Sequence, residues 1–310
     1  MNCSLIVRAF NEEKYLGRLL EGIQQQTVKN VEIILVESGS TDSTVSIAQS
    51  FGAKIVYIPS AEFTFGRALN FGIKAATSEL VVIASAHVFP VYPDWLECLL
   101  RPFEDEQIAL VYGKQRSSKT SQFSEGQIFR QWFPDLDVIR QDGPFCNNAN
   151  AAIRRSLWEQ HPYDETLTGL EDLSWAKWAQ GSNYVISYAA HAEIIHIHNE
   201  TQRGVHNRYR REAMAFKRIF PESHFNVYDF VRLTVTNIIS DLFHAVRQQV
   251  MLNNVMSIIW FRYMQFLGTY QGYRNSGPVT QKLRQTFYYP HWTAETSDDR
   301  GVEPIRYNNQ

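Results

Sequence analysis

The sequence predicts an α/β fold in which a mostly parallel sheet carries helices on both faces. Two observations in the first hundred residues support this. Short runs rich in Val, Ile and Leu recur along the chain, and segments with apolar residues at helical spacing lie between them. The connections between these segments are short, which is typical of parallel strands joined by crossover helices. Ligands of such sheets bind at the carboxyl ends of the strands.

The expected elements follow one another in a regular order. Strands are predicted at residues 3–9, 31–36, 54–58, 80–85 and 108–112, with helices at 12–26, 42–51, 65–76 and 93–103. Residues 113–170 show no regular pattern. After them we expect a helix at 171–180, strands at 184–188 and 193–198, and helices at 207–220, 228–250 and 254–273.

This order divides the chain into three parts. We expect a catalytic domain at 1–205, a helical C-terminal extension at 206–285 and a poorly ordered tail at 286–310.

Composition narrows the class of protein. Of 310 residues, 44% are hydrophobic and 20% are charged, which indicates a packed core. The net charge of -2 argues against a nucleic-acid partner. Cys3, Cys98 and Cys146 are widely spaced, so we expect reduced thiols in a cytoplasmic protein. The first apolar run is too short for a signal peptide, and no apolar window is long enough to span a membrane.

Polar groups follow the first two predicted strands. Phe10 and its polar neighbours can hold a base and ribose, although Asn11 could instead cap a helix. Glu37 can accept hydrogen bonds from a base or ribose, and Gly39 allows close backbone approach. The alternative for this second segment is a tight turn followed by a helix cap.

Histidines mark two further strand ends. His87 follows the fourth predicted strand and would face the same crevice, unless it is a structural group. His196 and His198 share one face of a predicted strand, which suits a metal or a diphosphate. Alternatively, the two histidines simply occupy the polar positions of a strand in which polar and apolar residues alternate.

Two adjacent carboxylates begin the helix predicted at 171–180. Glu171 and Asp172 can be favoured there by the helix dipole alone. Alternatively, one of them is a general base that deprotonates a sugar hydroxyl as it attacks.

Taken in order, these segments resemble family 2 glycosyltransferases of the GT-A fold. The resemblance covers about residues 3–200 and rests on Val-Arg-Ala-Phe-Asn-Glu-Glu at 7–13, Val-Glu-Ile-Ile-Leu-Val-Glu-Ser-Gly-Ser-Thr-Asp-Ser-Thr at 31–44, Phe-Thr-Phe-Gly-Arg-Ala-Leu-Asn at 63–70, and Glu171-Asp172. Within the family, the chain is most similar to rhamnosyltransferase-like enzymes of bacterial surface-polysaccharide assembly. Residues 261–272 also look like theirs.

The resemblance implies a role for each matching residue. Phe10 and Glu37 would hold the base, with Glu37 where the family usually has Asp. Asp172 would be the catalytic base, with Glu171 supporting the acceptor. The other residues implied at the nucleotide-sugar are Arg8, Glu12, Gly39, Arg67, Ser85 and His87, and those implied near the donor sugar or acceptor are Asn147, Asn148 and Asn150.

The chain departs from the family at the metal motif. Where the family has Asp-x-Asp, this sequence has Ser85-Ala86-His87. Mg²⁺ prefers oxygen ligands, and imidazole suits Zn²⁺ better than Mn²⁺. Three alternatives remain: His87 and His198 bind a divalent cation, or these histidines and Arg67 neutralise the diphosphate without a metal, or activity has been lost.

The predicted reaction is inverting transfer of a sugar from a nucleotide-sugar to a hydroxyl of a glycan or a lipid-linked glycan. One alternative is a catalytically degenerate binding or scaffold protein with the same fold. The other is a sugar nucleotidyltransferase, which would normally carry a basic, Gly-rich phosphate loop near the N-terminus. The sequence shows no such loop.

The C-terminal third is basic. Residues 201–285 contain 12 Lys and Arg but 4 Asp and Glu, and Arg232, Arg247 and Arg262 alternate there with aromatic and aliphatic residues. One interpretation is a helical hairpin packed on the core. The other is an interfacial surface that binds anionic lipid on the inner face of the cell membrane.

Overall fold

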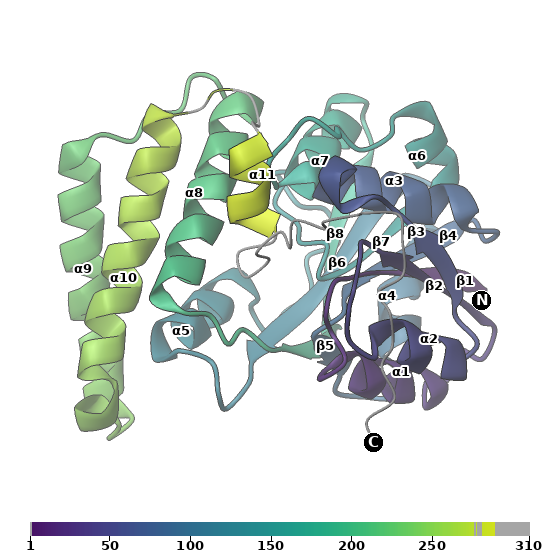
Figure 1. Cartoon of the computed structure of the whole chain (residues 1–310), viewed down its shortest axis with the longest axis horizontal. Helices are drawn as coiled ribbons and strands as arrows, with labels where there is room; N and C mark the ends of the chain where they lie inside the picture. The colour runs from purple at the N-terminus through teal and green to yellow at the C-terminus, as the bar shows by residue number, and fades with distance from the viewer. Residues whose placement is uncertain (1, 276, 278–280, 289–310) are drawn as a thin grey trace, which may run out of the picture.

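The computed structural model describes residues 2–275, 277 and 281–288 and has an eight-stranded sheet at its centre (Figure 1). The strands are β1 Cys3–Ala9, β2 Val31–Glu37, β3 Lys54–Tyr57, β4 Leu80–Ser85, β5 Val88–Pro90, β6 Ile108–Ser117, β7 Asn150–Arg154 and β8 Val185–His196. Their order in the sheet is β3-β2-β1-β4-β7-β6-β8-β5. The α/β fold is therefore as predicted.

The sheet has a parallel half and a mixed half. β1 pairs in parallel with β2 and β4, and β2 pairs in parallel with β3. β7 is antiparallel to β4 and β6, and β5 is antiparallel to β8, whereas β6 and β8 are parallel. The described sheet is mostly parallel, as predicted, because β1, β2, β3, β4, β6 and β8 all run in one direction. Only β7 and β5 run in the opposite direction.

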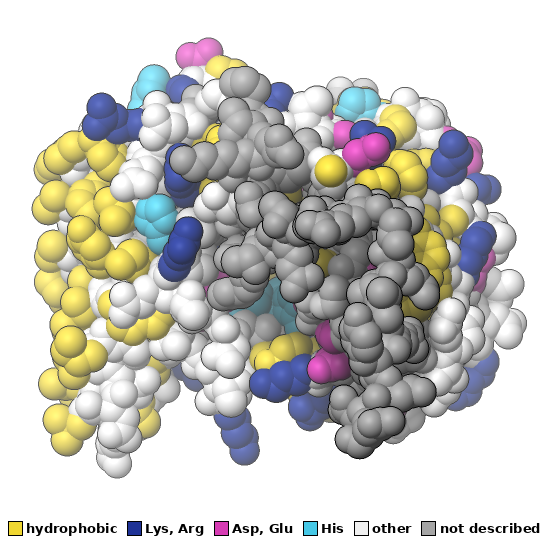
Figure 2. All heavy atoms as spheres, in the orientation of Figure 1, with side chains coloured by type: hydrophobic (Ala, Val, Ile, Leu, Met, Phe, Trp, Pro, Cys, Tyr) yellow, Lys and Arg dark blue, Asp and Glu magenta, His cyan; other side chains and the backbone are white. Residues whose placement is uncertain are grey.

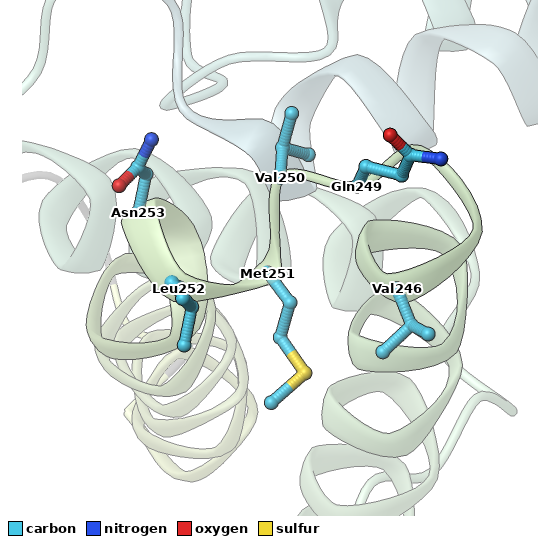
Figure 3. Close-up of a pocket in the computed structure, with 6 residues that line it drawn as sticks. All are labelled: Val246, Gln249, Val250, Met251, Leu252 and Asn253. Carbon is cyan, nitrogen blue, oxygen red and sulfur yellow. The ribbon is translucent and has the colours of Figure 1, made fainter.

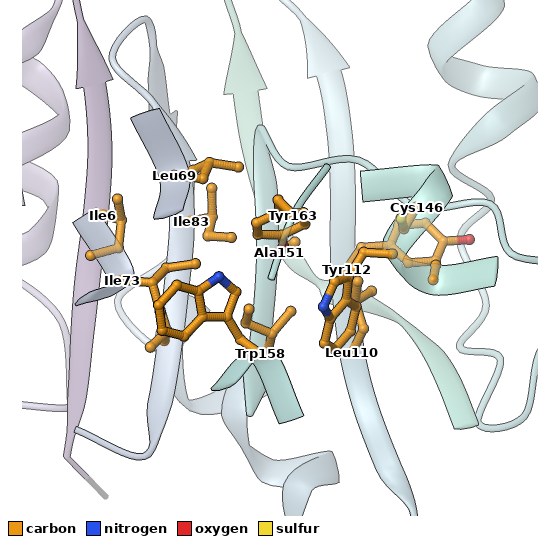
Figure 4. Close-up of a cluster of buried hydrophobic side chains, with 14 of the residues drawn as sticks. Ile6, Leu69, Ile73, Ile83, Leu110, Tyr112, Cys146, Ala151, Trp158 and Tyr163 are labelled. Atoms are coloured by element: carbon orange, nitrogen blue, oxygen red, sulfur yellow. The ribbon is translucent and has the colours of Figure 1, made fainter. Parts of the chain in front are cut away.

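Two apolar layers enclose the sheet, and successive side chains of each strand alternate between them. In β1, Leu5 and Val7 enter one layer and Ile6 enters the other. The first layer is covered by α1 Leu16–Gln24, α2 Thr44–Ser50 and α4 Trp95–Leu100. The second layer, part of which Figure 4 shows, is covered by α3 Phe65–Ala75, α6 Arg155–Gln160 and α7 Glu171–Gly181.

The middle of the chain is more regular than expected. β6 continues to Ser117, and α5 (Phe123–Trp132), β7 and α6 follow within the segment that we expected to be irregular. The strands predicted at 184–188 and 193–198 are one strand, β8, whose pairing with β6 is irregular between Gly113 and Gln115. Two short 3₁₀ helices, Ser60–Glu62 and Arg101–Glu104, lie earlier in the chain.

Among the described residues, four helices follow the sheet: α8 Gln202–Ile219, α9 Val227–Arg247, α10 Met251–Arg274 and α11 Gln281–Tyr288. α10 packs between α8 and α9, and α5 contacts this group from the sheet side (Figure 1). The domain boundary predicted at 205 therefore falls inside α8, and the one predicted at 286 falls inside α11. The part of the predicted tail beyond residue 288 lies outside the described residues.

The interior of the α9–α10 hairpin contains a paired charge. The Arg262 guanidinium donates to both carboxylate oxygens of Asp241, at 2.7 and 2.9 Å, and to Gln265 Oε1 at 2.9 Å. Arg262 and Asp241 are both buried. The expectation that Arg262 belongs to an exposed basic surface is therefore wrong, because its charge is neutralised between the two helices.

Two glycines set the distance between α10 and α8. A Cβ on Gly268 would overlap the carbonyl oxygen of His206, and a Cβ on Gly272 would overlap that of Arg210. The two helices therefore pack backbone to backbone, which explains why residues 267–272 need their small residues.

The outward side of the hairpin is apolar, as the hydrophobic atoms over α9 and α10 in Figure 2 show. We define the α9–α10 apolar face as the exposed side chains of Tyr228, Val231, Val235, Ile239, Phe243, Val246, Leu252, Met256, Ile259 and Tyr263. An open hollow at the turn between the two helices continues this surface (Figure 3). Within the described part of the chain, no helix has both the length and the apolarity needed to cross a bilayer.

Candidate active site

The carboxyl ends of six strands, β1, β2, β3, β4, β6 and β8, lie along one edge of the sheet. Arg8 of β1 is in register with Ser85 of β4 and with Val36 of β2, and Ser117 of β6 is in register with His196 of β8. β7 starts at the same edge, because Asn150 pairs with Ala84 of β4. Nearly all of the residues singled out in the sequence therefore lie along this carboxyl edge, as the parallel connections predict.

The loops after β1 and β2 are tied together. Asn11 has a left-handed backbone (φ 55°), and its side-chain oxygen accepts the backbone N–H of Thr41 at 2.8 Å. It does not cap a helix, because α1 begins only at Leu16. Glu37 is buried and accepts the backbone N–H groups of Gly39 and Ser40, with φ of Gly39 at 105°. The Glu37 carboxylate is thus held in one orientation at the strand end.

The two carboxylates of α7 lie in the interior of this edge. Leu170, the residue before the helix, is left-handed (φ 55°), a strained conformation that often marks functional sites. Asp172 Oδ2 accepts the Asn148 backbone N–H at 2.9 Å, and Asp172 Oδ1 accepts the Leu173 N–H at 2.8 Å. Burial, and then the neighbouring charge of Glu171, raise the pKa of Asp172 well above its ordinary range. A buried carboxylate with this pKa is suited to accept a proton.

Glu171 is paired with the first strand. Its carboxylate lies 3.0 Å from the guanidinium of Arg8, which also stacks over the Phe65 ring at 4.5 Å. A second cation, Arg211 of α8, lies at the same distance from that ring. Sequence analysis did not single out Arg211, because the contact depends on how α8 packs against the start of α3.

The last described helix also reaches the site. The Tyr288 hydroxyl donates to the carbonyl of Thr168 at 3.0 Å, and its ring packs edge-on against Phe63 and Phe65. Sequence analysis did not predict this contact, because it assigned residues 286–310 to a poorly ordered tail. The contact brings α11 next to the segment that leads into α7.

Three histidines meet where β4 and β8 end. Ring centroids are 4.0 Å apart for His196 and His198, 5.1 Å for His87 and His196, and 5.9 Å for His87 and His198. The candidate ligand atoms of the three lie within 4.8 Å of one another. Burial and the two neighbouring histidines lower the pKa of His196 well below its usual range. The structure thus joins the predicted His196–His198 pair to His87.

The three asparagines have different environments. The Asn147 side chain accepts the Ala149 N–H at 2.9 Å, and the Asn148 backbone holds Asp172. Asn150 has no exposed surface, and its amide bonds to the Trp95 indole at 2.9 Å and to the Ala192 carbonyl at 2.8 Å. Asn150 therefore has a structural role in this state of the protein and offers no surface to a sugar.

Arg67 lies at the N-terminus of α3. Its backbone N–H donates to the Thr64 hydroxyl, and its guanidinium contacts the carboxylates of Glu62 and, at 3.8 Å, Glu165. The side chain is about one-third exposed, at 34%. A diphosphate would therefore compete with two acidic partners for this cation.

With this geometry described, the chain can be compared with known proteins. Residues 4–161 match the family "Glycosyl transferase family 2". The chain belongs to glycosyl transferase family 2. This membership confirms the predicted enzyme class and favours it over the nucleotidyltransferase alternative.

Relatives of this glycosyltransferase include enzymes named for surface glycans. The chain is 27% identical over 222 residues to the O-antigen chain rhamnosyltransferase RfbN of Salmonella typhimurium, covering 67% of this chain and 70% of the relative. It is 29% identical over 197 residues to WbaN of Salmonella anatum, covering 60% and 62%. Its identity to the putative glycosyltransferase EpsH of Bacillus subtilis is 33% over 178 residues, covering 54% and 51%.

Solved structures confirm the GT-A fold. The mannosyltransferase PcManGT of Pyrobaculum calidifontis, in complex with GDP-Man and Mn²⁺, matches with a TM-score of 0.59 at 18% identity, over 89% of this chain and 85% of that one. TarS of S. aureus (residues 1–349), in complex with UDP-GlcNAc, matches with a TM-score of 0.54 at 16% identity, over 84% and 90%.

Proposed function

We propose that this glycosyltransferase transfers a sugar from a nucleotide-sugar to an acceptor hydroxyl, with inversion at the anomeric carbon, during assembly of a bacterial surface polysaccharide. The observation that carries the proposal is the buried Asp172 carboxylate, oriented by two backbone N–H groups at the carboxyl edge. The O-antigen rhamnosyltransferases among the relatives support the polysaccharide context.

Asp172 acts as the general base in this proposal. An acceptor hydroxyl donates a hydrogen bond to the carboxylate and transfers its proton as the oxygen attacks the anomeric carbon. The bond from that carbon to the diphosphate breaks on the opposite face, so the configuration inverts. The raised pKa favours this role, because a base is most effective when its pKa approaches the working pH.

The donor would lie across the β1 and β2 loops. Phe10 and Glu37 would contact the base, and Gly39 leaves room for close approach of the ribose. Ser85 and His87 would face the diphosphate from the end of β4. Asn147 and Asn148 would lie beside the sugar, because the Asn148 backbone is bonded to Asp172.

The test is the turnover of the Asp172→Asn variant. Removing a general base typically lowers the rate by about 10²–10⁴-fold, while donor binding is expected to be retained. The matched control is Asp142→Asn, because Asp142 is exposed and follows Gln141, whose N–H bonds to Ile186 near the amino end of β8. Transfer by Asp172→Asn at the parental rate would refute the assignment.

Donor identity is tested by thermal shift with UDP-, dTDP-, GDP- and CMP-sugars. We expect one nucleotide class to stabilise the protein and the Asp172→Asn variant equally. If none of the donors shifts the protein and none is turned over, the degenerate binding-protein alternative replaces the transferase.

We further propose that the acceptor is lipid-linked and that the enzyme docks on an anionic membrane through the α9–α10 apolar face. Ten exposed apolar side chains form this face. Two exposed cations are placed over aromatic rings of the same surface, Arg247 over Phe243 at 5.2 Å and Arg232 over Tyr228 at 6.0 Å. Aromatic and cationic groups on one helical surface are suited to a membrane interface.

Vesicle flotation tests the docking. Binding to phosphatidylglycerol-containing vesicles is expected for the full chain, and it should be lost in the double variant Ile239→Glu, Met256→Glu. The control is Leu136→Glu, which alters an equally accessible apolar residue (78% exposed) outside the face. If no binding occurs and the protein is instead a dimer in sedimentation experiments that the double variant abolishes, a second copy covers the face.

A further inference from the structure

Three histidines that are distant in sequence gather at the carboxyl edge of the sheet, and we call them the three-histidine cluster. His87, His196 and His198 come from two strand ends, yet their candidate ligand atoms lie within 4.8 Å of one another. The three rings are therefore close enough to share one ion.

The outer nitrogen of each ring is occupied by an oxygen atom. His87 Nδ1 lies 2.9 Å from Glu12 Oε1, and His196 Nδ1 lies 2.8 Å from Gln115 Oε1. His198 Nδ1 lies 2.6 Å from Glu125 Oε1. Carboxylate and amide oxygens only accept hydrogen bonds, so each Nδ1 must carry the hydrogen. In the neutral ring, each Nε2 then keeps a free lone pair. Histidine ligands of metal ions are oriented in this way by their outer-shell partners.

One of these lone pairs is buried without a partner. His196 is 5% exposed, and its Nε2 has no hydrogen-bond partner. A buried polar atom without a hydrogen-bond partner needs an explanation, and a bound ion is one of the few available. A metal ion between the three rings would satisfy Nε2 of His196.

A neighbouring group of metal-compatible residues is already neutralised. Glu125, His198 and Glu200 also lie close enough to share an ion. However, the Arg208 guanidinium is 2.7 Å from both carboxylates and supplies the positive charge there. Within the described part of the chain, no Arg or Lys side chain forms an ion pair or hydrogen bond with the three histidines themselves.

We infer that His87, His196 and His198 form an all-nitrogen site for a divalent transition-metal ion such as Zn²⁺ or Co²⁺. The donor set contains no carboxylate, and so it does not fit Mg²⁺, which requires oxygen ligands. Three imidazoles leave at least one coordination position open, as in catalytic rather than structural zinc sites. That the open position faces the donor diphosphate rests on the proposed function, whereas binding of the ion does not.

The test is a titration of the metal-free full chain with Co²⁺ alone, followed by visible absorption, with calorimetry for Zn²⁺, Mn²⁺ and Mg²⁺. We expect one Co²⁺ per chain with nitrogen coordination, and Mg²⁺ affinity at least about 100-fold weaker. Because loss of an outer-shell partner costs about 10–100-fold in affinity, removing a ligand with His87→Ala should cost more than that, and Glu12→Ala should fall within that range.

The matched control is His191→Ala, since His191 is an exposed histidine of the same strand as His196. It should bind Co²⁺ like the parent, as should Asp172→Asn, which separates ion binding from sugar transfer. His87 is partly exposed, so its variant is expected to fold, which circular dichroism checks. Unchanged Co²⁺ binding in His87→Ala, or Mg²⁺ binding as tight as that of Co²⁺, would overturn the inference. So would a metal-free protein that binds no Co²⁺.

Discussion

The carboxyl edge of the sheet and the α9–α10 hairpin place polar and apolar groups in opposite ways. At the edge, charged groups are drawn inward and held by specific partners, as Arg8 is by Glu171 and Asp172 by backbone N–H groups. In the hairpin, one charge pair lies inside and apolar side chains face outward. The first arrangement fixes charged groups in place, whereas the second leaves an apolar surface exposed.

Among the variants that test this comparison, the largest loss of stability is expected for a change inside the hairpin. Arg262→Met leaves the Asp241 carboxylate buried without its partner, which should lower the free energy of unfolding by about 3–5 kcal/mol. Replacing both residues, as Asp241→Leu with Arg262→Met, should recover most of this loss. Chemical denaturation of the single and double variants measures both values. An unchanged single variant would mean that the pair contributes little.

A smaller effect is expected where α10 meets α8. Gly268→Ala places a methyl group against the His206 carbonyl and should lower the free energy of unfolding by about 1–3 kcal/mol. Gly181→Ala is the control, because a Cβ at Gly181 would meet no atom within 4 Å. Equal stability of the two variants would contradict close backbone packing of the helices.

The pH dependence of turnover sharpens the description of the edge. Asp172 must be ionised to accept a proton, and its pKa is raised, so kcat/KM should fall as pH decreases through values well above the ordinary aspartate pKa of about 3.9. Glu171→Gln removes a neighbouring negative charge, so the fall in kcat/KM should occur at lower pH in this variant. If the fall occurs at the same pH as in the parent, Glu171 does not act on Asp172. Profiles of kcat/KM against pH, with stability checked at each pH, provide the measurement.

The smallest expected effect is on the stability of the apolar face. The double variant Ile239→Glu, Met256→Glu should change the free energy of unfolding by about 0.5 kcal/mol or less per site, because both side chains already face solvent. Chemical denaturation is again the measurement. A large loss would mean that the face supports the fold of the hairpin itself.

The N-terminal half could be predicted because its strands and helices are encoded locally. β1 and α1 carry their own apolar periodicity, so Leu16, Leu19, Leu20 and Ile23 are found as one buried stripe. β7 could not be found this way. Its five residues, Asn150–Arg154, become a strand only by pairing with β4 and β6, which are distant in sequence.

The candidate site shows the same limit. The motifs placed Glu37 and His87 at strand ends and Asp172 at the start of a helix, since these positions follow from the strand–helix order. Arg211 and Tyr288 reach the Phe65 ring from α8 and α11, and no local pattern specifies such contacts. The environment of Asn150 was not predictable for the complementary reason: its motif is polar, but its amide bonds to Trp95 and Ala192 inside the fold.

The position of β8 in the sheet determines which fragments of this enzyme keep the sheet intact when they are expressed. The segment that matches the family ends at residue 161, before β8 is synthesised, yet β8 lies between β6 and β5. A fragment that stops there would leave both strands with unpaired edges, which invite aggregation, and would lack Asp172 and His196 as well. A fragment that keeps the whole described sheet must therefore extend at least to His196, where β8 ends.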